Sequence, residues 1–153
     1  MLRRSFVLGL MPAAALAASA SGALATSAPR LVVSKSPTCG CCGAWAAHMR
    51  AAGFDVELRD MDQASLDAVK IHAGVPPELT SCHTGEIGGY VVEGHVPADD
   101  VKRLLALRPK LIGLAVPGMP VGSPGMEMGD AREPFDTIAF DASGRWEIFA
   151  RHT

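Results

Sequence analysis

Short blocks of apolar and polar residues follow one another along the chain and predict strands and helices in alternation. An apolar run at 31–33 and an alternating stretch at 54–58 predict two strands. Between them, the alanine-rich stretch 44–52 predicts a helix that carries Trp45 and Met49 on one face. The chain therefore opens on a strand–helix–strand unit.

The same alternation continues to the end of the chain. A helix is predicted over 65–73, with Leu66, Val69 and either Ile71 or Ala73 facing inward. The remaining predicted elements are a hairpin of strands 84–87 and 90–93 around Gly88-Gly89, a helix over 98–107, and two strands at 137–140 and 146–149. The order β-α-β-α-β-β-α plus a strand pair predicts an α/β class, specifically an atypical thioredoxin-like fold with an added C-terminal strand pair.

Residues 113–134 interrupt this pattern. Five glycines and four prolines fall in this stretch, so we expect one long loop. Loops of this length without regular structure are uncommon in compact domains and are often functional. Met119, Met126 and Met128 lie within it.

The first 25 residues have the composition of an export signal. Arg3 and Arg4 precede an uncharged apolar run that ends in Ala23-Leu24-Ala25, a small-x-small cleavage site. We therefore expect a signal peptide at 1–25, which leaves one domain at 26–153. The paired arginines also resemble a twin-arginine signal, and either the Sec or the twin-arginine route predicts a periplasmic protein. A single membrane anchor is the alternative.

Length and charge exclude several classes of function. A chain of 153 residues fits one domain, and a formal net charge of −2 provides no basic stripe for nucleic acid. After signal cleavage we expect no membrane attachment.

The four cysteines, Cys39, Cys41, Cys42 and Cys82, carry the strongest chemical signal. Three of them fall within four residues, directly after a predicted strand and at a helix start, so two ordinary structural disulfides are not expected. The unpaired N–H groups of a helix N-terminus stabilise thiolates, which are both nucleophiles and metal ligands. The spacing fits neither the common iron–sulfur runs nor paired zinc knuckles.

Cys82 and His83 lie just before the third predicted strand. In a thioredoxin-like topology the start of that strand faces the helix that bears the C-x-x-C, so we expect both residues to converge on Cys39–Cys42. Whether His83 is itself a ligand stays open at this point. The other histidines, His48, His72, His95 and His152, are expected to be structural or exposed, with a supporting role beside the site as an alternative for His95.

The methionines of the loop change the expected metal. Met119, Met126 and Met128 follow no helical period, unlike methionines that fill a core. Thiolate, imidazole and thioether donors together favour copper, and Cu(I) in particular. The predicted metal ligands are Cys39, Cys41, Cys42, Cys82, His83, Met119, Met126 and Met128.

Four segments resemble the CopG-type copper-resistance proteins, a family formerly described as a domain of unknown function. They are PTCGCCGAW at 37–45, SCHT at 81–84, GGYVVEGHVP at 88–97 and GLAVPGMPVGSPGMEM at 113–128. The resemblance implies a thioredoxin-like periplasmic domain that binds copper, with a multinuclear Cu(I)–thiolate cluster as one arrangement. It also implies copper ions and periplasmic copper efflux or detoxification proteins as partners.

Three functions follow from these residues. The first is copper binding in copper resistance, for storage, transfer or redox conversion of the ion. The second is thiol–disulfide exchange, with Cys39 and Cys42 as the C-x-x-C pair. The third is an interaction module held by disulfides.

Overall fold

The elements predicted from the hydrophobic pattern are present, with shifted boundaries. The computed structural model describes residues 27–153, so the signal peptide predicted at 1–25 lies outside the described residues. The elements in chain order are β1 (Arg30–Lys35), α1 (Gly40–Ala51), β2 (Asp55–Asp60), α2 (Gln63–His72), the 3-10 helix η1 (Pro77–Leu79), β3 (His83–Ile87), β4 (Tyr90–Gly94), α3 (Ala98–Leu107), β5 (Gly113–Val116), β6 (Phe135–Phe140) and β7 (Trp146–His152).

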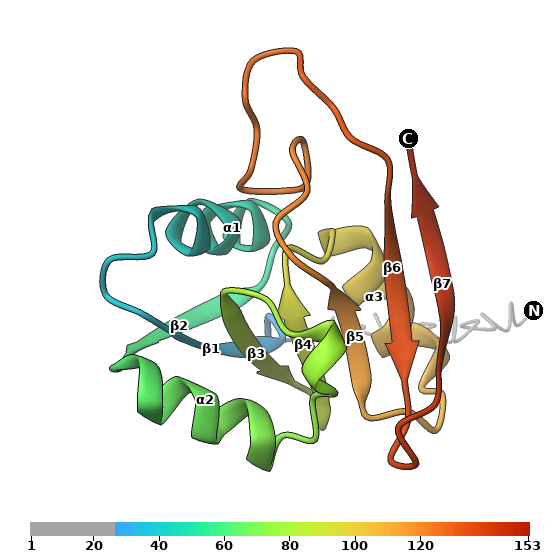
Figure 1. Ribbon diagram of the computed structural model, residues 1–153. Helices are drawn as coiled ribbons and strands as arrows, with labels where there is room; N and C mark the ends of the chain where they lie inside the picture. The colour runs from blue at the N-terminus through green and yellow to red at the C-terminus, as the bar shows by residue number, and fades with distance from the viewer. Residues whose placement is uncertain (1–26) are drawn as a thin grey trace, which may run out of the picture.

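The strands of this part of the chain form one sheet in the order β2-β1-β3-β4-β5-β6-β7 (Figure 1). β1 pairs in parallel with β2, and β4 pairs in parallel with β5, since α1 and α3 connect the members of these pairs as crossover helices. The other neighbours are antiparallel. The α/β class is confirmed, and the arrangement of β1 to β4 agrees with the thioredoxin-like expectation.

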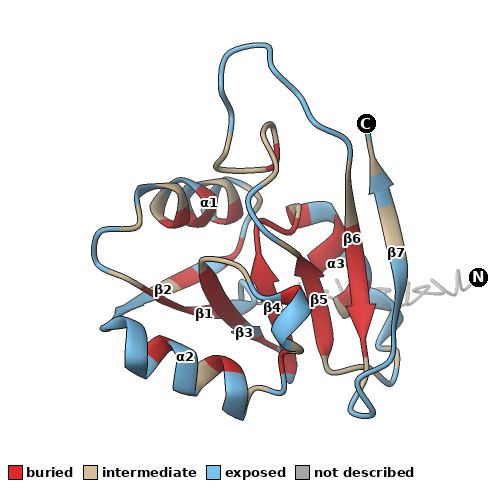
Figure 2. Ribbon diagram, viewed as in Figure 1, coloured by how far each residue is buried: buried red, intermediate tan, exposed pale blue. Residues whose placement is uncertain are grey.

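Helices cover both faces of the sheet (Figure 2). Side chains of α1 and α3, among them Trp45, Met49 and Leu104, pack in one core cluster with Leu31 and Val92 of the strands. A smaller cluster around Val75, Leu79 and Phe140 lies near η1 on the other side. Within the described residues, no helix is long and apolar enough to span a membrane.

β5 corrects the prediction of a loop over 113–134. All four of its residues are buried, and it lies in the sheet between β4 and β6. A strand buried on both faces has no alternation of polar and apolar residues, so a short apolar run before the glycine- and proline-rich stretch gives no periodic signal. The irregular segment is therefore 117–134, which we call the methionine loop.

Two helices also differ in detail from the prediction. α1 begins at Gly40 instead of residue 44, which places Cys41 and Cys42 in its first turn. In α2, Leu66 is buried and Ala73 packs against the core, whereas Ile71 is 79% exposed, so the inward position is Ala73.

The central position of β5 generates a stability prediction. Leu114 is fully buried, so Leu114→Ala should lower the free energy of unfolding by about 2–5 kcal/mol through lost burial and an unfilled cavity. Ile71→Ala, at an exposed site of α2, is the matched control and should stay within about 0.5 kcal/mol of wild type. Urea denaturation measures the free energy of unfolding of both variants, provided that the m-value is unchanged. Equal midpoints for the two variants would show that β5 is not part of the core.

Candidate metal centre

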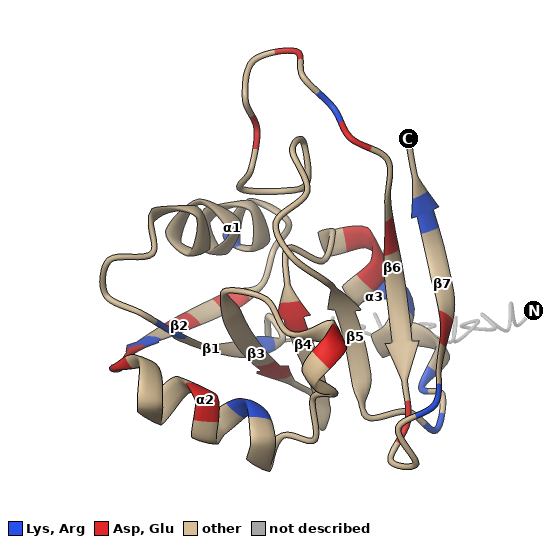
Figure 3. Ribbon diagram, in the orientation of Figure 1, with Lys and Arg blue, Asp and Glu red and all other residues tan. Residues whose placement is uncertain are grey.

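Three of the four cysteines lie at the N-terminus of α1. Cys39 is the N-cap residue with extended backbone angles, and its side chain makes no capping hydrogen bond. Cys41 and Cys42 follow in the first turn, which contains no acidic residue. In Figure 3 the ribbon at this end of α1 carries neither the blue of Lys and Arg nor the red of Asp and Glu. The free N–H groups and the dipole of the helix therefore act on the sulfurs without competition from a carboxylate.

The sheet brings Cys82 to the same place. β3 pairs with β1 in an antiparallel ladder whose last pair is Lys35 with His83, so Cys82 lies beside the end of β1 where the chain turns into α1. The Cys41 Sγ lies 3.5 Å from the Cys39 Sγ and 3.9 Å from the Cys82 Sγ. All four sulfurs lie within 4.8 Å of one another. The predicted convergence is thus present in the structure.

Two of the four thiols are joined. Cys39 and Cys42 form a disulfide with a Cα–Cα distance of 5.4 Å, which is the pairing expected of a C-x-x-C motif. Cys41 and Cys82 are free, and both are half-buried. Burial raises the pKa of the Cys82 thiol to about 12, with the charge of Cys41 as the second cause. A soft cation would lower that pKa, because metal binding releases the thiol proton.

The structure places His95 in the centre, beyond the structural or exposed position expected for it and closer than the supporting role that was its alternative. It is fully buried, and its Nε2 lies 3.1 Å from the Cys82 Sγ. Its Nδ1 lies 2.8 Å from the Pro124 carbonyl oxygen, which can only accept, so Nδ1 carries the proton and Nε2 presents a lone pair to the sulfur. A neutral imidazole that donates its one N–H to a carbonyl and presents the lone pair of its other nitrogen is the usual state of a metal-ligating histidine.

His83 lies on the same side of Cys82. Its Nδ1 is 3.3 Å from the Cys82 Sγ, and its ring packs against Trp45 with centroids 4.4 Å apart. Trp45 is itself held by a 2.8 Å hydrogen bond from its Nε1 to the Val96 carbonyl. Burial lowers the pKa of both His83 and His95, so both rings favour the neutral form that binds metals.

The donor set fits a copper ion. Cys82, His83 and His95 form a second group of ligand atoms within 4.8 Å of one another, which shares Cys82 with the four-cysteine group. The Nε2 of His83 is buried and has no hydrogen-bond partner among the described residues. Such a nitrogen is costly unless something binds it, and a metal ion is one such partner.

The methionine loop packs onto the centre through its backbone. Near the start of the loop, the Gly118 carbonyl accepts a hydrogen bond from the hydroxyl of Ser81, the residue before Cys82. Further along, a Cβ added to Gly125 would lie 2.6 Å from the backbone nitrogen of Trp45 and 2.8 Å from the Cys41 carbonyl oxygen. The loop therefore approaches the backbone of α1 closely. Figure 1 shows the loop rising beside α1 and returning to β6.

The three methionines of the loop differ in exposure. Met126 follows Gly125 and is half-buried, whereas Met119 and Met128 are 51% and 64% exposed. Their role as copper ligands stays a prediction.

The remaining histidines lie outside the two groups of ligand atoms. His48 accepts the Ala98 N–H at 3.2 Å and so caps α3, which has no side-chain cap at Pro97. His152, expected at a frayed end, forms a 2.9 Å pair with Asp100. His72 is exposed on α2. These three residues have structural or surface positions, as the sequence indicated.

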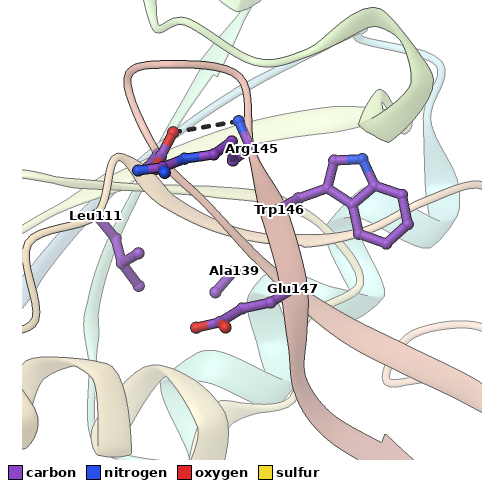
Figure 4. Close-up of a pocket in the computed structure, with 6 residues that line it drawn as sticks. Leu111, Ala139, Arg145, Trp146 and Glu147 are labelled. Atoms are coloured by element: carbon purple, nitrogen blue, oxygen red, sulfur yellow. Dashed lines mark hydrogen bonds and ion pairs between the residues drawn. The ribbon is translucent and has the colours of Figure 1, made fainter.

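One hollow of the surface lies away from the cysteines and histidines of the centre. A depression of about 370 Å³ lies at the turn between β6 and β7, where Asp141 pairs with Arg145 beside Trp146 and Glu147 (Figure 4). Its lining contains neither cysteine nor histidine. This hollow is therefore not part of the candidate metal centre.

Known proteins resemble this chain over most of its length. A solved structure titled "Copper resistance protein copG- Form 2" is 44% identical, with a TM-score of 0.76, and the match covers 82% of this chain and 99% of that one. A second, titled "Copper resistance protein copG- Form 1", is 46% identical with a TM-score of 0.75, over 80% and 96% of the two chains. The family described as "Protein of unknown function, DUF411" matches residues 79–126. A search of curated proteins returns no match.

The close approach of the loop to α1 generates a second prediction. Gly125→Ala should push the methionine loop off α1, because an added Cβ meets the backbone of Cys41 and Trp45 and the residue has φ +86°. Tryptic cleavage after Arg132, within the loop, should then accelerate under native conditions. Gly144→Ala is the control, with φ +79° in open space. Equal cleavage rates in the two variants would show that the loop does not depend on this contact.

Proposed function

Because the chain belongs to the family of CopG copper-resistance proteins, we propose that it is a copper-binding protein of the periplasm that acts in copper tolerance. The ion is held as Cu(I) by Cys39, Cys41, Cys42 and Cys82, and the protein stores it, transfers it or converts its oxidation state. The composition of residues 1–25, which predicts an export signal, supports the compartment.

The observation that carries this proposal is the convergence of four cysteine sulfurs within 4.8 Å. Thiolates are soft donors, and a set of four at such short separations suits several Cu(I) ions that share sulfurs. A helix N-terminus supports the negative charge of the thiolates before the metal arrives.

The two imidazoles extend the ligand set. His83 and His95 both approach Cys82, so a copper ion at that sulfur also has nitrogen donors within reach. Nitrogen ligands suit Cu(II) as well as Cu(I), which supports a centre that tolerates both oxidation states. Met119, Met126 and Met128 add thioether donors from the loop that covers the centre.

The disulfide determines when the full ligand set is available. A dithiol reductant that is itself oxidised to a disulfide must first supply two electrons and two protons to the S–S bond, which gives the Cys39 and Cys42 thiols. These thiols lose their protons when they bind the metal as thiolates. Copper loading through all four sulfurs therefore requires the reduced chain.

Anaerobic titration of the reduced protein with Cu(I) tests the proposal. We expect at least one tightly bound Cu(I) per chain, with ultraviolet absorption of Cu(I)–thiolate bonds and a mass increase of the intact protein. Cys39→Ser together with Cys42→Ser should abolish most of this uptake. Less than one Cu(I) per wild-type chain, or unchanged binding by the double variant, would refute the proposal.

A variant of His95 tests whether this residue is a copper ligand. His95→Asn should weaken Cu(I) binding by roughly 10- to 100-fold, measured by competition with a chromophoric chelator. His72→Asn, at an exposed position on α2, is the matched control and should bind as wild type. Equal affinities for the two variants would remove His95 from the ligand set.

The Cys39–Cys42 disulfide favours thiol–disulfide exchange as a second candidate. The free Cys41 sulfur, 3.5 Å from the Cys39 sulfur, could resolve or scramble this bond. Reduction of insulin disulfides in the presence of a tight copper chelator separates the two functions. Turnover under these conditions supports exchange, and its absence leaves copper binding as the function of the centre.

A further inference from the structure

A buried ion pair lies beneath the centre, on the face of the sheet that α2 covers. The Lys70 ammonium of α2 donates to the Glu93 carboxylate of β4 at 2.6 Å and to the Thr84 hydroxyl at 3.0 Å. The Thr84 hydroxyl donates in turn to the second carboxylate oxygen of Glu93 at 2.7 Å. Lys70 and Glu93 are 5% and 0% exposed, so the charges are almost fully removed from water.

Stability alone does not explain such a pair. Transferring two charges into a protein interior costs free energy that offsets much of their attraction. Replacing a buried ion pair by apolar residues of similar volume often gives a protein of equal stability. A buried ion pair is better explained when the geometry that it imposes is needed elsewhere.

The Glu93 carboxylate reaches the peptide that carries Cys82. Its Oε1 accepts the Ser81 N–H at 2.7 Å, while its Oε2 accepts from Thr84. Ser81 precedes β3, and the β3–β4 ladder starts with the pair Thr84–Glu93, so no ladder bond holds this amide. One carboxylate thus holds the residues on both sides of Cys82 and His83.

We propose that Glu93 is a positioning residue that holds Cys82 and His83 at the copper centre, and that Lys70 fixes its carboxylate. This inference rests on the proposed copper function. Ser81 and Thr84 transmit the constraint to Cys82 and His83 through the backbone. The methionine loop is tied to the same point, because the Ser81 hydroxyl holds Gly118.

Two double variants isolate the hydrogen bond from the charges. Lys70→Met with Glu93→Gln removes both charges and keeps a carbonyl oxygen that can accept the Ser81 N–H. Lys70→Met with Glu93→Leu removes both charges and that acceptor. The two proteins therefore differ only in the side chain at residue 93, which keeps a polar group for Ser81 and Thr84 in the Gln variant and loses it in the Leu variant. Urea denaturation verifies that both are folded.

The first measurement needs no copper. It uses a background of Cys39→Ser and Cys42→Ser, in which Cys41 and Cys82 are the remaining cysteines and their sulfurs lie 3.9 Å apart. Glutathione disulfide oxidises these two thiols to a disulfide and is itself reduced to two molecules of glutathione. The Leu variant should form this bond roughly tenfold more slowly than the Gln variant, because its Cys82 is no longer held in place. A role confined to global stability would leave the two rates equal.

The second measurement is Cu(I) affinity with all four cysteines present. The Leu variant should bind roughly 10- to 100-fold more weakly than the Gln variant, as expected when a group that orients a metal ligand is lost. Equal rates and equal affinities in the two folded variants would overturn the positioning role. If wild type itself takes up no Cu(I), the copper function fails, and the metal-free rates still decide the role of Glu93.

Thr84→Val decides the question if either double variant does not fold. It removes the hydroxyl that links Glu93 to β3 and leaves both charges in place. Slower formation of the Cys41–Cys82 disulfide supports positioning, and an unchanged rate contradicts it.

Discussion

The antiparallel pairing of β1 with β3 is the constraint on which the centre depends. It places His83 opposite Lys35, at the end of β1, and so brings Cys82 beside the first turn of α1. Neither half is a site alone, because Cys39, Cys41 and Cys42 on one side and Cys82 on the other are 40 residues or more apart along the chain. The candidate metal centre is therefore a consequence of sheet topology and forms only when the sheet does.

Much of the fold could be predicted because its signals are local. Hydrophobic periodicity located three helices and six of the seven strands, and Gly88-Gly89 identified the hairpin. The same hairpin register, which pairs Thr84 with Glu93, brings His95 level with Cys82 when it is extended beyond the ladder. This register signal for His95 is present in the sequence, although the position of His95 after the strand does not by itself distinguish a structural residue from one beside the site. β5 gave no comparable signal, because a short strand buried on both faces has no alternation to detect.

The methionine loop shows a different limit. Its composition correctly indicated a long irregular segment, yet composition does not determine where a loop packs. That is determined by single contacts, such as the one between Gly125 and the backbone of α1, which become visible only in three dimensions. The Cys39–Cys42 disulfide belongs to the same category, since neighbouring cysteines permitted several pairings and local geometry selects one of them.

Buried polar groups on both faces of the sheet meet at the peptide that carries Cys82. His83 and His95 lie on the side of Trp45, while Glu93 and Lys70 lie on the side of α2. The core elsewhere is mostly aliphatic and aromatic, and each buried imidazole or charge costs free energy that an apolar side chain would not. Departures from an apolar interior that gather at one peptide are expected where function, and not folding, determines the residues. Asp100 and Thr137 form another buried polar contact, between α3 and β6. The group around Cys82 has members on both faces of the sheet and lies at the same location as the cysteine sulfurs.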